Sequence, residues 1–202
     1  MALPEIPTLV GDYVRLEPLS HEHAADLSIA SDDGKLHELW YTWVPDAAGM
    51  TAEIDRRLGL YAQGTMMPFA TIDVESGKAI GMTTFMNMKL ENFKIEIGST
   101  WMAASYQGTA INPEAKLLML SYAFDVLNCN AVELRTHEKN AQSRAAIEKL
   151  GAKLDGMLRN DMVMGNGTLR NTAVYSITKD EWPGVHDGLI ARLDDLEQAE
   201  EA

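Results

Sequence analysis

The residues from Tyr106 to Asn112 have types and a spacing that suit the binding of an anion. They read Tyr-Gln-Gly-Thr-Ala-Ile-Asn and join an expected strand over 94–102 to an expected helix that runs to about Leu127. Asn112 is predicted to cap this helix and Pro113 to take its first position, as both residue types favour. The N–H groups of a first helical turn have no intrahelical partners, so they can bind a diphosphate.

An ordinary strand–helix connection would contain the same small residues, so the segment alone leaves both interpretations open. No Gly-Lys-Ser/Thr follows its glycine, and the chain contains no Gly-x-Gly-x-x-Gly. The sequence therefore gives no support to a P-loop or a dinucleotide-binding fold.

A second candidate site lies at the start of the helix expected from Asn140 to Leu150, which Gly151 ends. Asn140 follows an expected strand over 131–136, and Ser143 lies one turn further along the helix. Asn140 has a plain use as an N-cap and Ser143 as a first-turn residue. A structural role and a binding role do not exclude each other at these positions.

The pattern around these candidates predicts a single α/β domain over residues 1–202, with a mixed sheet flanked by helices. No linker and no internal repeat divides the chain. The last expected helix, over 184–202, is acidic and amphipathic, and its apolar stripe would pack within the chain or on a second copy. About seven strands are predicted, over 13–19, 69–73, 79–86, 94–102, 131–136, 153–164 and 169–177.

The charge of the chain is strongly negative and concentrated at its ends. The 202 residues include 17 Lys and Arg against 30 Asp and Glu, a formal charge of −13. Residues 1–50 hold 2 basic and 9 acidic residues, and residues 180–202 hold 1 and 8. Such ends disfavour nucleic acid as a partner and attract a cationic substrate, although solubility alone would also explain them.

Several classes of protein are excluded by simple features. The only cysteine, Cys129, rules out an internal disulfide and a Cys-rich zinc site. The most apolar long segment, 117–127, is too short to span a membrane, and the first ten residues lack Lys and Arg. We expect a cytoplasmic protein with no membrane contact. His21 and His23 are two apart and do not share a helix face, so no metal site is expected.

The order of these segments resembles the GNAT N-acetyltransferase superfamily, specifically its ribosomal-protein-acetyltransferase-like (RimJ/RimL-like) branch. The resemblance runs from Val-Arg-Leu-Glu-Pro-Leu at 14–19 to Thr-Lys-Asp-Glu-Trp-Pro at 178–183. The family's diphosphate motif, Gln/Arg-x-x-Gly-x-Gly/Ala, falls on 107–112, where Ala110 stands for glycine and Asn112 for Gly or Ala. The segment 140–152 is more specific, and it is similar to the Asn-x-x-Ser and Lys-Leu-Gly-Ala segment of this branch.

The resemblance implies a mostly antiparallel sheet that splays at a central parallel pair of strands, 94–102 and 131–136. Acetyl-CoA would lie between these strands, its pantetheine arm paired with exposed backbone groups, and no metal would be needed. The implied cofactor-binding residues are Ser99, Thr100, Trp101, Met102, Gln107, Gly108, Thr109, Ala110, Ile111, Asn112, Asn140 and Ser143.

The implied reaction moves an acetyl group directly from acetyl-CoA to an amine of a small molecule, a peptide or a protein N-terminus. Backbone N–H groups near 98–101 would stabilise the oxyanion. Asn140 would bind the reacting end, and Ser143 would hydrogen-bond or protonate the departing thiolate. Cys129 lacks an adjacent base and is not expected to form an acyl-enzyme.

The attacking amine must lose a proton, and the base is the least determined part of the site. Glu96 is the first candidate because it alternates with Ile95 and Ile97, which places it on the opposite face of the strand. Whether that face is the acceptor cleft or solvent stays open. The alternatives are His137 and Glu138 acting through water, Tyr106 as an acid, and a water chain with no protein base.

Trp40, Tyr41 and Trp43 are expected to wall the acceptor pocket, where aromatic rings suit a cationic amine. They could equally form a hydrophobic lid without ligand contact. Two alternative functions also stay open. One is an acyltransferase that uses succinyl-CoA as its donor. The other is a non-catalytic CoA-binding or interaction module, which the departures at Ala110 and Asn112 motivate. Whether the protein forms a homodimer is left open by the sequence.

Overall fold

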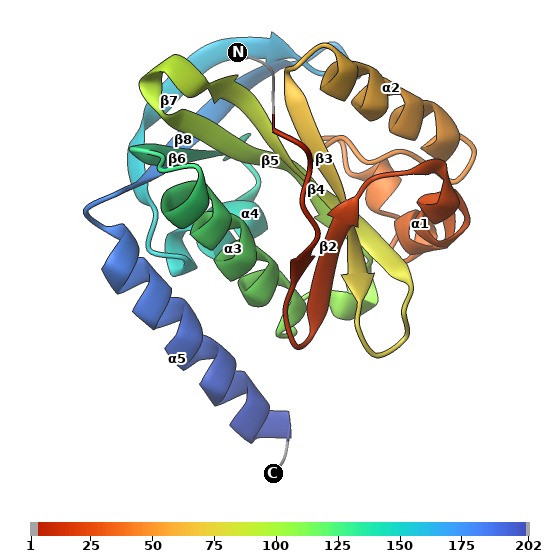
Figure 1. Cartoon of the computed structure of the whole chain (residues 1–202). Coiled ribbons are helices and arrows are strands. Elements are labelled where there is room, and N and C mark those ends of the chain that lie inside the picture. Colours follow the sequence, from red (N-terminus) through yellow and green to blue (C-terminus); the bar gives the residue numbers. More distant parts are fainter. Residues whose placement is uncertain (1–3, 201–202) are drawn as a thin grey trace.

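The computed structural model describes residues 4–200 and shows one sheet of eight strands in the order β1-β2-β3-β4-β5-β6-β8-β7 (Figure 1). The predicted mixed α/β sheet is confirmed, with one strand more than expected. The additional strand, β1, has only two residues, too few for an alternating pattern to reveal. The strands are β1 Leu9–Val10, β2 Val14–Pro18, β3 Met66–Asp73, β4 Ala79–Lys89, β5 Lys94–Met102, β6 Ala131–His137, β7 Lys153–Val163 and β8 Leu169–Thr178.

Helices cover both faces of the sheet (Figure 1). Helices α1 and α2 pack on one face, where Leu27 and Ile54 belong to the smaller of two hydrophobic clusters. The other three lie on the opposite face, over a larger cluster that includes Met119, Ile147 and Leu189. The helices are α1 Ala24–Asp32, α2 Met50–Ala62, α3 Ile111–Ser121, α4 Ala141–Lys149 and α5 Trp182–Glu200, and a π-helical segment, Tyr122–Val126, extends α3.

The sheet opens between β5 and β6, its one parallel pair among the described strands. Pairing runs from Lys94 opposite Ala131 to Ile97 opposite Leu134 and then stops, although both strands continue. Gly98, Trp101 and Met102 stay paired with β4 and residues 135–137 with β8, so the two strand ends diverge from each other. The expected splay is confirmed. Backbone groups that face the gap lack a partner strand and can pair with a ligand.

A β-bulge in β5 begins where the splay begins. Met82 pairs with Trp101 and Thr84 with Gly98, so Thr83 of β4 lies opposite both Ser99 and Thr100. Ser99 has a φ of 47°, the left-handed region that non-glycine residues seldom adopt. Such a backbone costs about 1 kcal/mol or more and persists only where neighbouring contacts hold it.

Helix α3 starts earlier than the sequence indicates. Asn112 was expected as its N-cap and Pro113 as its first residue, but the helix begins at Ile111 with Ala110 as N-cap. This prediction is wrong because proline needs no N–H partner anywhere in the first turn, where no intrahelical acceptor exists. The Glu114 amide donates to the Ala110 carbonyl and closes that turn.

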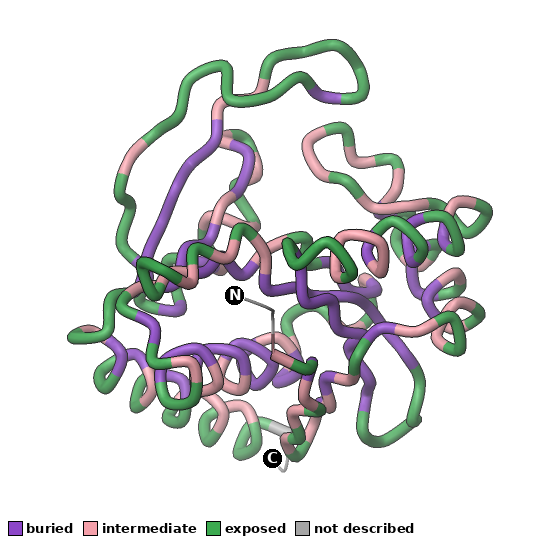
Figure 2. The backbone as a smooth tube through the Cα atoms, turned by 45° about the horizontal axis from the view of Figure 1, so that its top comes forward, coloured by how far each residue is buried: buried purple, intermediate pink, exposed green. Residues whose placement is uncertain are grey.

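The sheet ends in an exposed edge strand. All but one residue of β7 are exposed, whereas β8 is largely buried (Figure 2). Helix α5 lies beside α3 (Figure 1), and it buries Trp182, Val185 and Leu189. The apolar stripe of this helix packs within the chain, although Ile190, next to Leu189, is 39% exposed.

Glu114 fastens the N-terminal hairpin to α3. Its carboxylate is buried and accepts hydrogen bonds from the backbone amides of Asp12, Tyr13 and Val14 at 2.7–2.8 Å. A Cβ at Gly11 would lie 2.3 Å from the Glu114 carboxyl carbon, so only glycine allows this approach. The turn between β1 and β2 is thus fixed by a side chain about a hundred residues away in the sequence.

We expect Glu114→Ala to lower the free energy of unfolding by about 3 kcal/mol, because it leaves three backbone amides, that of Val14 fully buried, without their charged acceptor. Glu114→Gln keeps one acceptor oxygen and should lose less. Urea unfolding measures both, with Glu75→Ala in an exposed turn as the control. Equal stability of Glu114→Ala and Glu75→Ala would contradict this role.

Candidate active site

Three buried side-chain polar atoms lack a hydrogen-bond partner within residues 4–200, and all three belong to the splayed strands. They are the indole Nε1 of Trp101 on β5 and, on β6, Nε of Arg135 and Nε2 of His137. Buried polar atoms in folded proteins are almost always satisfied. Their gathering beside the gap indicates that this region is built to hold a polar ligand.

The loop before α3 offers backbone amides at the mouth of the gap. Gly108 has a φ of 86°, and a Cβ there would meet no atom within 4 Å, so the space beside this backbone is open. Thr109 turns its hydroxyl inward and donates to the Tyr106 carbonyl at 2.8 Å. Ala110 and Ile111 are buried, while Asn112 is half-buried on the first turn of α3. Together with that first turn, the loop presents backbone N–H groups of the kind that bind anions at helix N-termini.

Gln107 connects the two sides of the splay. Its Nε2 donates to the Met102 carbonyl at the end of β5, and its Oε1 accepts from Gln142 of α4 at 2.9 Å. The side chain predicted to bind diphosphate is therefore already hydrogen-bonded to the protein. Gln107 thus links the end of β5 to the first turn of α4.

Asn140 caps α4, its Oδ1 accepting from the Ser143 amide at 3.0 Å. The cap uses one oxygen lone pair and leaves the Asn140 amide N–H groups available, while Ser143 is half-buried in the first turn. Both residues lie shortly after β6. The structure therefore places them at the same end of the gap between β5 and β6 as the hydrogen bond between Gln107 and Gln142.

A buried arginine on α2 holds the bulge of β5. Arg57 is 1% exposed, and its guanidinium donates to Glu53 Oε1 at 2.7 Å, Thr84 Oγ1 at 2.8 Å and the Ser99 carbonyl at 3.0 Å. On the opposite face of the sheet, Thr100 Oγ1 lies 2.8 Å from Thr83 Oγ1. These contacts fix the Ser99 carbonyl and so the direction of the amides that follow it.

Glu96 lies beside the bulge on the face that α1 and α2 cover. It is 5% exposed, its Oε2 accepts from Asn87 Nδ2 at 2.7 Å, and Arg135 Nε is 3.4 Å away. A Cβ at Gly98 would be 3.0 Å from Glu96 Oε1, so this oxygen points along β5 toward the bulge. Burial raises the pKa of Glu96 above its ordinary value and outweighs the contacts with Asn87 and Arg135. The face is thus buried, which the sequence had left open.

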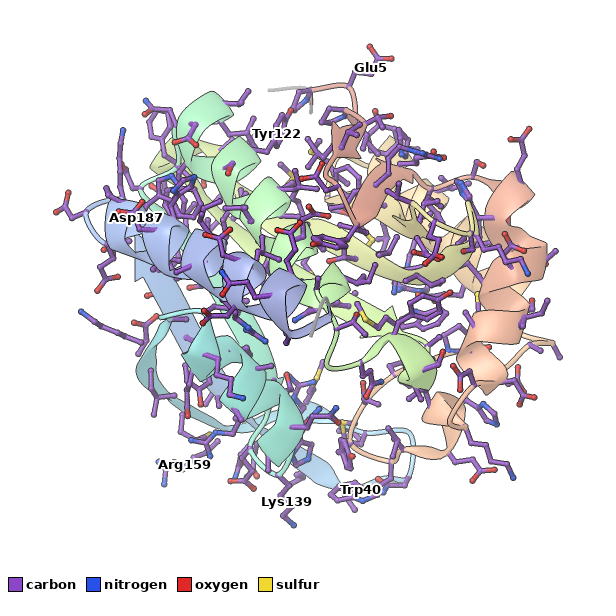
Figure 3. All side chains as sticks on the ribbon, turned by 90° about the horizontal axis from the view of Figure 1, so that it is seen from below. Glu5, Trp40, Tyr122, Lys139, Arg159 and Asp187 are labelled. Carbon is purple, nitrogen blue, oxygen red and sulfur yellow. The ribbon has the colours of Figure 1, made fainter. Side chains whose placement is uncertain are left out.

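His137 and Trp40 meet at the end of β6. His137 follows the strand expected over 131–136, but in the structure it ends β6 and is 2% exposed, and the Trp40 ring packs edge-on against it at 5.2 Å. Its Nδ1 accepts from the Lys139 amide, and burial lowers the pKa of the imidazole. Lys139 Nζ lies 5.6 Å from the Trp40 ring, and Figure 3 shows these two side chains side by side. His137 is therefore a neutral imidazole, and its Nε2 has no hydrogen-bond partner among the described residues.

The three predicted acceptor-pocket aromatics do not form one wall. Tyr41 packs edge-on against Trp40, whereas Trp43 is 70% exposed and leans toward Gly165 at the tip of the β7–β8 hairpin. Trp101 and Met102 also separate, since Trp101 packs with the α1–α2 cluster and Met102 with the α3 cluster. Of these five side chains, three predicted for the acceptor pocket and two for the cofactor, Trp40 and Trp101 lie on the Glu96 face of the splayed strands.

Three further expectations from the sequence concern Cys129 as a nucleophile, a metal site and a membrane-spanning helix. Burial raises the pKa of the Cys129 thiol to about 11, opposite to what a nucleophilic thiol requires. Within residues 4–200 no three His, Cys, Asp or Glu side chains gather as a metal site would need. No helix in the same range has both the length and the apolar composition needed to cross a bilayer.

Sequence patterns missed several residues that shape the site. Arg57 continues the apolar spacing of Met50 and Ile54, and Glu53 four residues earlier was the available signal for a buried ion pair. Lys116 stands within an apolar helical run, and nothing in the pattern assigns it a position. Arg135 alternates with Glu133 on β6, which predicts a shared face but not the approach to Glu96.

The fold is that of an N-acetyltransferase. The model of the GNAT acetyltransferase domain family matches residues 14–153. The chain therefore belongs to the GNAT family.

Individual relatives agree with this assignment. A crystal structure of a GCN5-related N-acetyltransferase from Brucella melitensis is 32% identical, with a TM-score of 0.84, covering 94% of this chain and 86% of the other. A crystal structure of a protein from T. thermophilus, described as an acetyltransferase, is 31% identical over 96% of this chain and 99% of the other, with a TM-score of 0.82.

One curated relative carries a more specific name. The Bacillus subtilis protein YdaF, named as a ribosomal N-acetyltransferase, is 33% identical over 108 residues. These residues make up 54% of this chain and 58% of YdaF, so the match spans little more than half of either protein.

Loss of Arg57 is expected to damage both stability and donor binding. Arg57→Met should cost on the order of 3 kcal/mol, because it leaves the buried Glu53 carboxylate with Arg56 alone. The double variant E53Q/R57M removes the unpaired charge and should recover part of this loss. It still lacks a donor to the Ser99 carbonyl, so acetyl-CoA affinity stays reduced.

Urea unfolding and calorimetric titration with acetyl-CoA measure the two effects separately. The control is Arg56→Met, the same substitution at the neighbouring residue, which also pairs with Glu53 but is largely exposed. Full recovery of acetyl-CoA affinity in the double variant would show that Arg57 has no effect on the bulge.

Proposed function

We propose that this chain transfers an acetyl group from acetyl-CoA directly to the N-terminal amine of a peptide or protein. The observation that supports it most is the gap between β5 and β6, with a bulge on one side and, beside it, Trp101 Nε1 and His137 Nε2, two buried polar atoms without a hydrogen-bond partner among the described residues. An open strand edge of this kind is costly to bury unless a ligand completes its hydrogen bonds.

The donor would be held at three places. Backbone amides of 108–112 and the first turn of α3 bind the diphosphate through the helix terminus. The unpaired edge of 99–102 hydrogen-bonds the pantetheine arm, and Asn140 and Ser143 contact its reacting end from the start of α4. The donor supplies an acetyl thioester, and the bulge amides stabilise the negative charge on its carbonyl oxygen.

Glu96 fits the role of general base. It lies on the face opposite α3, beside the bulge, and burial raises the pKa of its carboxyl above the ordinary value, which makes the carboxylate a stronger base. Asn87 and Arg135 hold Oε2, which orients Oε1 along β5 to accept the proton of the incoming amine. His137 is the second candidate, because its neutral ring has a free Nε2 on the same face.

The acceptor is assigned from charge and from resemblance. The loop around Trp40 and the β7–β8 hairpin meet where Trp43 approaches Gly165, so they flank the Glu96 face. The acidic terminal segments attract a basic protein, and YdaF is named for ribosomal acetylation. A basic protein N-terminus meets both conditions better than a small amine.

The direct test is thiol release from acetyl-CoA with a panel of basic peptides that have free or blocked N-termini, beside small amines. Turnover only with free N-termini supports the proposal. Turnover with small amines alone contradicts the acceptor, and higher kcat/KM with succinyl-CoA contradicts the donor. CoA binding without release on any amine identifies a non-catalytic module.

Replacement of Glu96 should change the pH profile. Glu96→Gln is expected to lower kcat/KM by about 10²-fold or more and to remove the acid limb, which in the wild type lies above the ordinary glutamic acid pKa because burial raises it. His137→Gln is the control. If the limb disappears in His137→Gln and stays in Glu96→Gln, the base is His137.

Asn140→Ala should weaken acetyl-CoA binding more than it weakens the fold. Loss of the cap costs about 1 kcal/mol of stability, whereas loss of a donor contact appears in calorimetric affinity. Asn140→Ser keeps a capping oxygen and serves as the comparison. Equal acetyl-CoA affinity in the wild type and both variants would leave Asn140 with the cap alone.

A further inference from the structure

Lys116 is a buried cation without an anionic partner among the described residues. It lies on α3, is 6% exposed, and its Nζ has one polar contact, Thr100 Oγ1 at 3.5 Å. It takes part in none of the ion pairs between residues 4 and 200. An ammonium buried in this way destabilises the fold, so its position calls for an explanation in function.

The surroundings of Lys116 place its ammonium at the splay. Thr100 belongs to the bulge of β5 and is exposed, because β6 no longer covers that stretch of the strand. From β4, Thr83 faces the same point, with its Oγ1 2.8 Å from Thr100 Oγ1. These hydroxyls are neutral, and burial alone lowers the pKa of Lys116 to about 8. An ordinary thiol has a pKa near 8.5, so the two groups are matched for proton transfer.

Lys116 and Glu96 lie on opposite faces of β5. Alternation and the bulge put Glu96 on the face of α1 and α2, and Thr100 and Lys116 on the face of α3. The sheet thus separates the Glu96 carboxylate from the Lys116 ammonium. A base on the acceptor side and an acid on the donor side are what acyl transfer from a thioester to an amine needs.

We propose that Lys116 is the group that protonates the CoA thiolate as it leaves. The inference rests on the acetyl transfer proposed above. The amine nitrogen bonds to the carbonyl carbon, the carbon–sulfur bond breaks with its electron pair on sulfur, and the sulfur takes a proton from Lys116 Nζ. The amine loses one proton to Glu96, Glu96 then releases that proton to solvent, and Lys116 regains its proton from solvent. Ser143, which the sequence suggested for this step, keeps a hydrogen-bonding role at most.

The test measures the thiol pKa of bound CoA, which needs no acceptor and no turnover. Ultraviolet absorbance of the thiolate gives this pKa for the wild type and for Lys116→Met, Lys116→Gln and Ser143→Ala. A cation near the sulfur should lower the thiol pKa by about one unit or more. We expect that lowering in the wild type and in Ser143→Ala, and its loss in both Lys116 variants. Lys78→Met, in an exposed turn, is the control and should behave as the wild type.

Kinetics complete the test. Lys116→Met and Lys116→Gln should lower kcat on the order of 10²-fold with little change in KM for acetyl-CoA. Methionine fits an apolar site, and glutamine keeps a hydrogen bond to Thr100, so at least one variant should keep the wild-type fold. An unchanged thiol pKa in both Lys116 variants overturns this inference alone, as does a loss confined to Ser143→Ala. A wild type that does not bind CoA overturns the proposed function as well.

Discussion

The early end of β-pairing between β5 and β6 is the constraint on which the site depends. Four residue pairs join the strands, and the bulge at Ser99 then directs β5 away from β6. A left-handed backbone at serine is unfavourable, and three hydrogen bonds from Arg57, including one to the Ser99 carbonyl, hold it in place. The result is a slot with backbone polar groups along one wall and orphaned side-chain atoms beside it.

The sheet also divides the chemistry between its two faces. Glu96, His137 and Trp101 lie on the side of α1 and α2, where an acceptor would approach between the Trp40 loop and the β7–β8 hairpin. Lys116 and the first turn of α3 lie on the other side, where the donor would bind. Burial raises the pKa of Glu96 and lowers that of Lys116 to about 8, which makes the carboxyl a stronger base and the ammonium a stronger acid. Strand β5 lies between Glu96 and Lys116.

Sequence reasoning succeeded where periodicity is strong and failed where single contacts decide. The strand over 94–102 was predicted to the residue because alternation and flanking turns agree. The start of α3 was misplaced because Asn112 and Pro113 fit several positions of a first helical turn equally well. Arg57 and Lys116 were missed because a pattern of apolar positions does not register a buried charge. The splay came only from the resemblance, since no local propensity encodes where pairing stops.

The most direct measurement is an NMR titration of the amide-labelled protein with acetyl-CoA. The account predicts that the largest shifts fall on the amides of 98–102, 108–112 and 135–137, and that the β7–β8 hairpin tip and the C-terminal half of α5 stay unchanged. Shifts concentrated on the hairpin or α5, with the two strand ends unaffected, would show that the donor binds elsewhere and would contradict the account.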